Sequence, residues 1–390
     1  MIVREATSFR GSLALLALAL AALACSGDDD PGSGGAGGNA GTIGTGGSAG
    51  VASGGQGGAA GVTGSTGGQG GATGGAGGAG ATGGSGGTGG GTSDAGTTDG
   101  AVPEPDAGVT LPTTWTTGAA MPTIRTELAV AEQGGRIYVA GGFGGPSAFE
   151  AYDPAGDSWE PLADLPVPLD HPSLAAHGGL IYLTGGDSAA LYAYDPAQDE
   201  WTDRNAMIHA RYAAAMVALG DALFVVGGTG PADTVLQRYD TASGEWSEAA
   251  ALSVTRDHVA AVVLGGKIYA LGGRAGLGVM HASIEIYDPV ADRWTPGAAM
   301  QESRSGFGAA VIAGQIYVAG GEVLELPFSV RDTVERFDPA AGEWHFEASL
   351  PSPLHGIGAT SWDGRLLVFG GASEPAAADP RTGIVHIYGP

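Results

Sequence analysis

The 390-residue chain contains few basic residues. One lysine, Lys267, and 15 arginines stand against 41 acidic residues. Eight of the acids and two of the arginines precede residue 111, so the remainder of the chain carries 33 acidic and 14 basic residues. That excess of negative charge repels nucleic acid, and no run rich in Lys or Arg offsets it. Nucleic-acid binding is therefore excluded.

The chain also lacks the common catalytic motifs. Residues 111–390 contain no Gly-x-Ser-x-Gly turn, and no His-Glu-x-x-His sequence occurs anywhere. The glycine-rich runs nearer the N-terminus lack the lysine and the flanking strand and helix of a phosphate-binding loop. We expect a binding protein rather than an enzyme, with no cofactor.

A single cysteine excludes a disulfide framework within the chain.

Residues 1–25 have the pattern of an export signal: Arg4 and Arg10 are followed by the apolar run Leu13–Leu23 and by Ala24, directly before Cys25. Eleven apolar residues are too few to span a bilayer. Leu-Ala-Ala-Leu-Ala-Cys resembles the bacterial lipoprotein box, whose cysteine is acylated. The resemblance implies a protein exported and anchored by lipid at Cys25 in the bacterial cell envelope, in the outer membrane. An ordinary secretory signal with an incidental cysteine is the alternative.

Large apolar residues are scarce between residues 26 and 110, where Gly, Ala, Ser and Thr dominate. Such a segment cannot bury enough surface to offset its ordering entropy, so we predict a flexible, disordered tether. Residues 111–390 remain, enough for one large all-β domain with a substantial core.

A repeated pattern organises that domain. Gly-Gly pairs recur at 141–142, 185–186, 227–228, 272–273, 320–321 and 370–371, with offsets of 42 to 50 residues. This spacing is near the period of propeller blades. Each unit predicts four strands. The first is a run of small apolar residues, and a Gly-Gly or Asp-Gly hairpin joins it to a second run that ends in the paired glycines. The third run has an aromatic before Asp, and the fourth opens on Trp.

Aromatic residues at fixed offsets predict core packing rather than a cofactor site. We expect them to fill the wedge between neighbouring blades, with their N–H and O–H groups bonded to backbone. The paired glycines should allow close backbone approach. The aromatics are Tyr152, Tyr194, Tyr239, Tyr287, Phe337 and Tyr388 in the third run, and Trp159, Trp201, Trp246, Trp294 and Trp344 in the fourth.

The double glycine, the aromatic before Asp-Pro and the Trp resemble the kelch family over residues 111–390. The resemblance implies a six-bladed kelch-type β-propeller. The sixth unit lacks its Trp strand, but Trp115–Met121 copies Trp294–Met300 and precedes unit one. We predict that this N-terminal strand completes the last blade and removes two open sheet edges. Five complete blades with a ragged end is the alternative.

The loops between the second and third strands, here called the b–c loops, lengthen in units four to six, through Arg274–Ser283, Glu322–Thr333 and Ala372–Thr382. They should lie on the same face as the crossovers from each fourth strand to the next blade. Because loops on a rigid scaffold often bind partners, we predict a protein or glycan ligand there. Neutral variation of surface loops is the alternative.

Four arginines lie sixteen residues before the first glycine of their units. A partial ring of them around the channel mouth would suit carboxylates, and the kelch resemblance implies binding of acidic peptide or sugar groups. Pairing with nearby acids, which would hold the blades in register, is the alternative. The candidate ligand-binding residues are Arg125, Arg211, Arg256 and Arg304, together with Arg274, Glu322 and His355.

Three histidines raise the question of a metal. His171 and His258 lie fourteen residues before their glycine pairs and His355 lies fifteen before. Blades two and four are not adjacent, however, and no carboxylate recurs beside these histidines at ligand spacing. We therefore predict no metal site.

These features predict a monomeric, envelope-anchored binding scaffold. The alternative is a periplasmic sugar mutarotase or isomerase that resembles the sialic-acid epimerase type and acts in the central channel with Glu322 and Arg304. A copper oxidase of the kelch type, which needs a tyrosine linked to cysteine, is excluded because Cys25 lies before the tether.

Overall fold

The computed structural model describes residues 114–389. The predicted export signal, Cys25 and the predicted tether lie outside these residues. The described part consists of 26 strands joined by turns and loops. Within it, no helix is long and apolar enough to cross a membrane.

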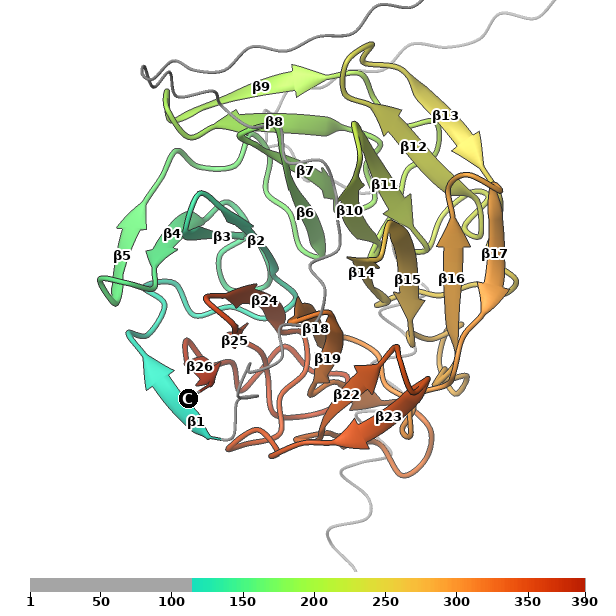
Figure 1. Ribbon diagram of the computed structural model, residues 1–390. Coiled ribbons are helices and arrows are strands. Elements are labelled where there is room, and N and C mark those ends of the chain that lie inside the picture. The colour runs from blue at the N-terminus through green and yellow to red at the C-terminus, as the bar shows by residue number, and fades with distance from the viewer. Residues whose placement is uncertain (1–113, 390) are drawn as a thin grey trace, which may run out of the picture. The chain divides into compact units, whose positions relative to one another are not determined.

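Six antiparallel sheets of four strands surround a central axis (Figure 1). Blade one holds β2 (Ala129–Gln133), β3 (Arg136–Ala140), β4 (Phe149–Asp153) and β5 (Ser158–Pro161); blade two holds β6 (Pro172–His177), β7 (Leu180–Gly185), β8 (Leu191–Asp195) and β9 (Glu200–Arg204); blade three holds β10 (Ala215–Leu219), β11 (Ala222–Val226), β12 (Leu236–Asp240) and β13 (Trp246–Ala249). Blade four holds β14 (Ala260–Leu264), β15 (Lys267–Leu271), β16 (Ile284–Asp288) and β17 (Arg293–Pro296); blade five holds β18 (Gly308–Ile312), β19 (Gln315–Ala319), β22 (Val334–Asp338) and β23 (Glu343–Phe346); blade six holds β24 (Gly358–Trp362), β25 (Arg365–Phe369), β26 (Val385–Tyr388) and β1 (Trp115–Gly118). The b–c loop of blade five adds a small ribbon of β20 (Glu322–Val323) and β21 (Ser329–Val330).

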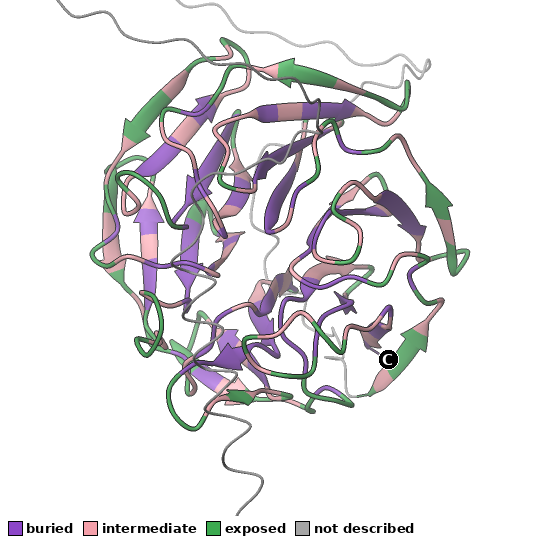
Figure 2. Ribbon diagram, turned by 180° about the vertical axis from the view of Figure 1, so that it is seen from behind, coloured by how far each residue is buried: buried purple, intermediate pink, exposed green. Residues whose placement is uncertain are grey.

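Burial follows strand order within each blade. The second strands are almost wholly buried, whereas the fourth strands are largely exposed at the outer edge (Figure 2). The hairpins between first and second strands turn tightly because their residues have positive φ, as at Gly265 (60°) and Gly266 (69°).

The last blade is closed by the N-terminal strand, as predicted. β1 pairs with β26 in the register Trp115↔Tyr388, which matches Trp294↔Tyr287 in blade four. The five-blade alternative is therefore wrong. The first described strand and the last belong to one sheet, so both ends of the domain are held by the same blade (Figure 1).

The paired glycines allow the backbones of neighbouring blades to approach closely, as predicted. The Gly273 N–H donates to the Arg304 carbonyl of the following blade at 2.9 Å. A Cβ on Gly272 would lie 2.8 Å from that same oxygen, closer than side chains tolerate. The same bond forms at four other seams, from Gly142, Gly228, Gly321 and Gly371.

The tryptophans fill the seams between blades and bond to backbone, as predicted. The indole N–H groups of the six fourth-strand tryptophans donate to carbonyls of the preceding blade or the crossover that leaves it, at 2.7–3.2 Å: Trp115 to Ala348, Trp159 to Ala119, Trp201 to Ala163, Trp246 to Asn205, Trp294 to Ala250 and Trp344 to Ala298. The tyrosine hydroxyls differ from the expectation. Tyr152, Tyr194 and Tyr287 donate to aspartates on their own blades instead of to backbone, because the turn between third and fourth strands carries a carboxylate within reach.

Candidate functional site

Each blade contributes one residue with left-handed backbone to a ring around the axis. The six residues lie fourteen positions before their glycine pairs, with φ from 48° to 61°: Glu127, His171, Ala213, His258, Gly306 and Gly356. Five of their N–H groups donate to the carbonyl of a ring neighbour, as from Gly356 to Gly306 at 2.6 Å. This narrow ring lines a cavity of about 120 Å³.

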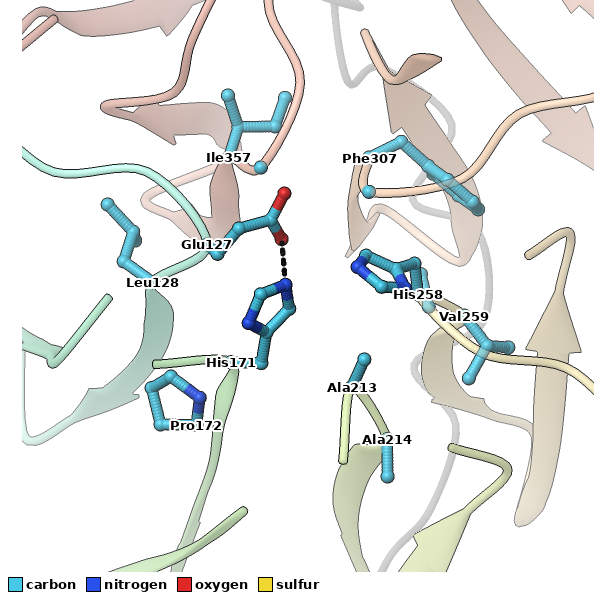
Figure 3. Close-up of a pocket in the computed structure, with 13 residues that line it drawn as sticks. Glu127, Leu128, His171, Pro172, Ala213, Ala214, His258, Val259, Phe307 and Ile357 are labelled. Atoms are coloured by element: carbon cyan, nitrogen blue, oxygen red, sulfur yellow. Dashed lines mark ion pairs between the residues drawn. The ribbon is translucent and has the colours of Figure 1, made fainter. Parts of the chain in front are cut away.

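Three polar side chains of the ring point into this cavity. His171 Nε2 lies 3.5 Å from a carboxylate oxygen of Glu127, and the His171 and His258 rings are 4.8 Å apart, centroid to centroid (Figure 3). Ligand atoms of all three residues lie within 4.8 Å of one another. Histidines of the non-adjacent blades two and four therefore do meet, so blade order does not exclude a metal site as predicted. At the axis the ring is so narrow that side chains from non-adjacent blades come into contact.

Arg274, Glu322 and His355, three of the seven predicted site residues, extend this cluster. His355 Nδ1 lies 3.5 Å from Glu127 and 3.6 Å from Glu322. Arg274 donates to Asp257 at 2.8 Å and to Glu322 at 2.7 Å.

Contacts within the cluster favour the charged forms of Glu127 and His355. Burial raises the pKa of Glu127, but the His171 charge and the bond to His355 outweigh burial, so the pKa of this carboxyl falls below its ordinary value. Burial lowers the pKa of His355, but Glu127 and Glu322 outweigh it, so the pKa of this imidazole is raised.

The other four predicted residues lie inside the blades. Arg125, Arg211, Arg256 and Arg304 are each at most 1% exposed. The Arg304 guanidinium donates to the carbonyls of Gly320 and Thr333 and pairs with Glu335 at 2.7 Å. Arg125 and Arg256 likewise tie the glycine pair of their own blade to its b–c loop and third strand. Arg211 instead donates to the carbonyls of Pro231 and Ala232 in its b–c loop. None of the four arginines stands open at the channel mouth. Three of the four pair with an acid, as in the structural alternative, and each pair lies within one blade: Arg125 with Glu150, Arg256 with Glu285 and Arg304 with Glu335.

The acid–arginine pair of the isomerase alternative does not form. Glu322 accepts from Arg274 and from the Ala376 N–H, whereas Arg304 is occupied by Glu335. No hydrogen bond or ion pair joins Glu322 to Arg304 in residues 114–389.

The b–c loops share one face with the crossovers between blades, here called the loop face. Backbone bridges such as Asp257↔Arg274 and Ser305↔Glu322 join crossover to loop. Eight large apolar side chains of the described residues are exposed, and six of them lie on segments of the loop face: Ile124, Ile208, Val254, Leu277, Val279 and Leu326.

Two of the long loops are tied to one another. The Gly278 N–H of blade four donates to the Leu324 carbonyl of blade five at 3.1 Å, and the Met280 N–H donates to the Glu325 carboxylate at 3.2 Å. Leu277 (54% exposed) and Leu326 (81%) therefore project from a pair of connected loops.

Sequence reasoning missed Glu127 altogether. The signal was present: Glu127 occupies in unit one the same offset of fourteen that singled out His171 and His258. Aligning all six units at that offset would have shown a carboxylate and two imidazoles at equivalent ring positions.

Two family models match the chain. A model described as the KLHDC2/KLHL20/DRC7 Kelch-repeats domain matches residues 172–371, and the Kelch motif matches residues 124–166. Together they include all or part of each of the six blades.

One curated relative and one solved structure give further comparisons. Spermatocyte protein spe-26 of Caenorhabditis elegans is 33% identical over 79 residues, which are 20% of this chain and 14% of that protein. A structure titled "Structure of YjhT" superposes with a TM-score of 0.61 at 16% identity, over 69% of this chain and 96% of that one. At that identity the likeness concerns the fold. The repeats, the six closed blades and the family models agree that the chain belongs to the kelch-repeat proteins.

Proposed function

We propose that this kelch propeller is a non-catalytic scaffold that recognises a protein or glycan through its loop face. The observation that carries the proposal is the gathering of six of the eight exposed large apolar side chains on that face. Single exposed apolar residues are ordinary, but a concentration on one face is typical of interaction sites. Leucine, isoleucine and valine side chains favour a protein over a glycan as the partner.

Preorganisation of the loops supports the same proposal. The bonds between the blade-four and blade-five loops, and the β20–β21 ribbon, hold Leu277 and Leu326 in place before any partner arrives. A partner then pays little of the entropy of ordering a loop. The acidic balance of the domain favours a partner surface that is apolar at its centre and basic at its rim.

The test begins with peptide and glycan arrays probed with the full chain. For the ligand found there, the double variant Leu277→Asp/Leu326→Asp should weaken binding by at least about tenfold, because each charge must be desolvated in the contact. The melting temperature should stay unchanged, since both side chains are exposed.

Val290→Asp is the matched control. Val290 is 96% exposed but lies in the turn between β16 and β17, away from the b–c loops. A ligand that is insensitive to the double variant, or that responds equally to the control, would contradict the loop face as the binding surface.

We further propose that the protein is exported and anchored by lipid at Cys25. The supports are the basic and apolar pattern of residues 4–24 and the single cysteine that follows it. A glycine-rich coil of the length of residues 26–110 would span about 50 Å root-mean-square. Cys25→Ser should move the protein from the membrane fraction to the soluble fraction and remove its lipid mass in intact mass spectrometry. Wild-type protein without a lipid mass would refute lipid anchoring.

A further inference from the structure

Beyond the scaffold function, we propose that the cavity at the axis is a site for a divalent transition-metal cation such as Zn²⁺, bound by the Glu127 carboxylate and the His171 and His258 imidazoles. We call these three residues, together with Asp257, Arg274, Glu322 and His355, the axial cluster. Its members come from five different blades or their crossovers.

The positions of the three ligands favour a metal site. Their ligand atoms lie within 4.8 Å of one another, and two ligands of one tetrahedral zinc lie roughly 3.3 Å apart. Because hydrogen bonds hold the backbone of each ligand in the ring, a bound metal would close that difference through rotation of the side chains. Two imidazoles and one carboxylate form a donor set that zinc adopts in sites with an open fourth position. The fourth position here would face the cavity of about 120 Å³, which has room for water.

The excess of carboxylates over guanidinium groups in the axial cluster also favours the binding of a cation. Asp257, Glu127 and Glu322 face a single guanidinium, that of Arg274. Asp170, 3.6 Å from His171 Nδ1, adds a further carboxylate that is partly exposed. Unbalanced charge is costly in a site whose Asp257 and Glu322 are only 6% and 2% exposed, and a bound divalent cation removes that imbalance.

A neighbouring carboxylate already orients one of the two imidazoles, that of His258. Asp257 lies 2.7 Å from His258 Nδ1, which leaves Nε2 to act as the ligand in the arrangement common at zinc sites. Arg274 now contacts that Nε2 at 3.2 Å, but it keeps two carboxylate partners if it gives this contact up. His171 Nδ1 is buried and has no hydrogen-bond partner among the described residues. Glu127 and Asp170 are the two carboxylates near this ring, at 3.5 and 3.6 Å.

The donor set selects the class of metal. Imidazole nitrogens suit Zn²⁺, Co²⁺, Ni²⁺ and Cu²⁺, whereas Ca²⁺ and Mg²⁺ prefer shells of oxygen ligands. Zn²⁺ and Co²⁺ are therefore the probes, and Mg²⁺ is the negative control.

The test uses the full-length protein after treatment with a chelator. Zn²⁺ titrated against a chromophoric competitor should bind once per chain, and Co²⁺ should give the visible absorption of a site with nitrogen ligands. His171→Gln and His258→Gln should each weaken Zn²⁺ binding by at least about 100-fold, and Asp257→Asn, which removes an orienting partner, by roughly 10-fold. His345→Gln, on the outer strand β23, should leave the affinity unchanged.

Melting curves and circular dichroism of every variant separate loss of the site from loss of the fold. If a histidine variant does not fold, Glu127→Gln provides the same measurement with a smaller change in shape. Wild-type protein that binds no Zn²⁺, or folded His171→Gln and His258→Gln variants that bind it as wild type does, would overturn the proposal. The latter result would assign the binding to surface groups.

Discussion

At the scale of single residues, Arg304 shows how a charged side chain becomes part of a propeller core. Its guanidinium has no exposed surface, yet it meets the carbonyls of Gly320 and Thr333 and the carboxylate of Glu335. Glu335 in turn accepts the Gln301 N–H at 2.6 Å, so both charges are paired and bonded. Removing either partner of such a pair destabilises the fold, because the other charge would remain buried and unpaired.

We therefore expect Arg304→Ala to lower the free energy of unfolding by about 3–5 kcal/mol. Urea denaturation of the full chain measures this value. Arg136→Ala is the control, because Arg136 pairs with Glu160 at the surface and should change stability by no more than about 1 kcal/mol. Equal effects of the two variants would show that the Arg304–Glu335 pair is not a core interaction.

Asp157 is a second residue with a measurable role. Its carboxylate accepts the Ala119 N–H, which follows β1 of blade six, and the Tyr152 hydroxyl of blade one. These bonds hold the pKa of Asp157 below its ordinary value. A carboxyl with a lowered folded-state pKa stabilises the fold above its unfolded pKa of about 3.9, and this contribution is lost as the pH falls through the folded value.

Asp157→Asn should consequently be less stable than wild type at neutral pH, and the difference should shrink as the pH falls below about 4. Urea midpoints measured from pH 3 to pH 7 would show this convergence. Asp164→Asn, a change at an exposed aspartate in the crossover from β5 to β6, should give a difference that is small at every pH. A gap between wild type and Asp157→Asn that widens toward acid pH would contradict the assigned bonds.

The sequence predicted residue roles well where the role repeats in every unit. The glycine pairs and tryptophans recur six times in the described blades, so their packing and bonding followed from period alone. The arginines recur too, but their burial depends on which carbonyls the b–c loop leaves unbonded, and no spacing in the sequence shows that. The tyrosine hydroxyls were assigned to backbone because the position of the turn aspartate relative to the ring emerges only in three dimensions.

At the scale of elements, β1 decides whether the ring is closed. It supplies the fourth strand of blade six, its Trp115 indole bonds to the Ala348 carbonyl of blade five, and Met121 just beyond it is 3% exposed. This strand was predictable because Trp115–Met121 repeats the residue pattern of a fourth strand, although it precedes the first unit.

Deleting residues 1–121 should therefore lower stability by several kcal/mol relative to deleting residues 1–110. The longer deletion uncovers apolar surface of β26 and leaves its backbone groups without partners, at about 1 kcal/mol for each lost bond and about 25 cal/mol for each Å² exposed. Thermal melting of the two truncated proteins checks this. Identical melting temperatures would mean that β1 contributes nothing to closure.

At the scale of the whole molecule, the axis brings together residues that the sequence keeps far apart. Glu127 and His355 are more than 220 positions apart in the chain and belong to the crossovers into blades one and six, which closure makes neighbours. His171 and His258 meet because the ring is narrow rather than because their blades touch. The size of that ring depends on how closely six blades pack, which a repeat period does not specify.

The charge of the whole domain leads to the last prediction. Between residues 111 and 390 there are 33 acidic and 14 basic residues, and the strongest pairs, such as Arg304–Glu335, are buried. Salt screens the mutual repulsion of exposed acids, because the Debye length falls from about 30 Å at 0.01 M to about 8 Å at 0.15 M, whereas buried pairs are screened far less. We expect the melting temperature at pH 7 to rise as NaCl increases from 10 to 150 mM, by about 2–4 °C for each kcal/mol of repulsion removed. Calorimetry at constant pH measures the change, with Arg136→Ala as a control that should respond somewhat more strongly because it adds to the negative excess. A melting temperature that falls over this range would instead show that exposed ion pairs stabilise the propeller more than its net charge destabilises it.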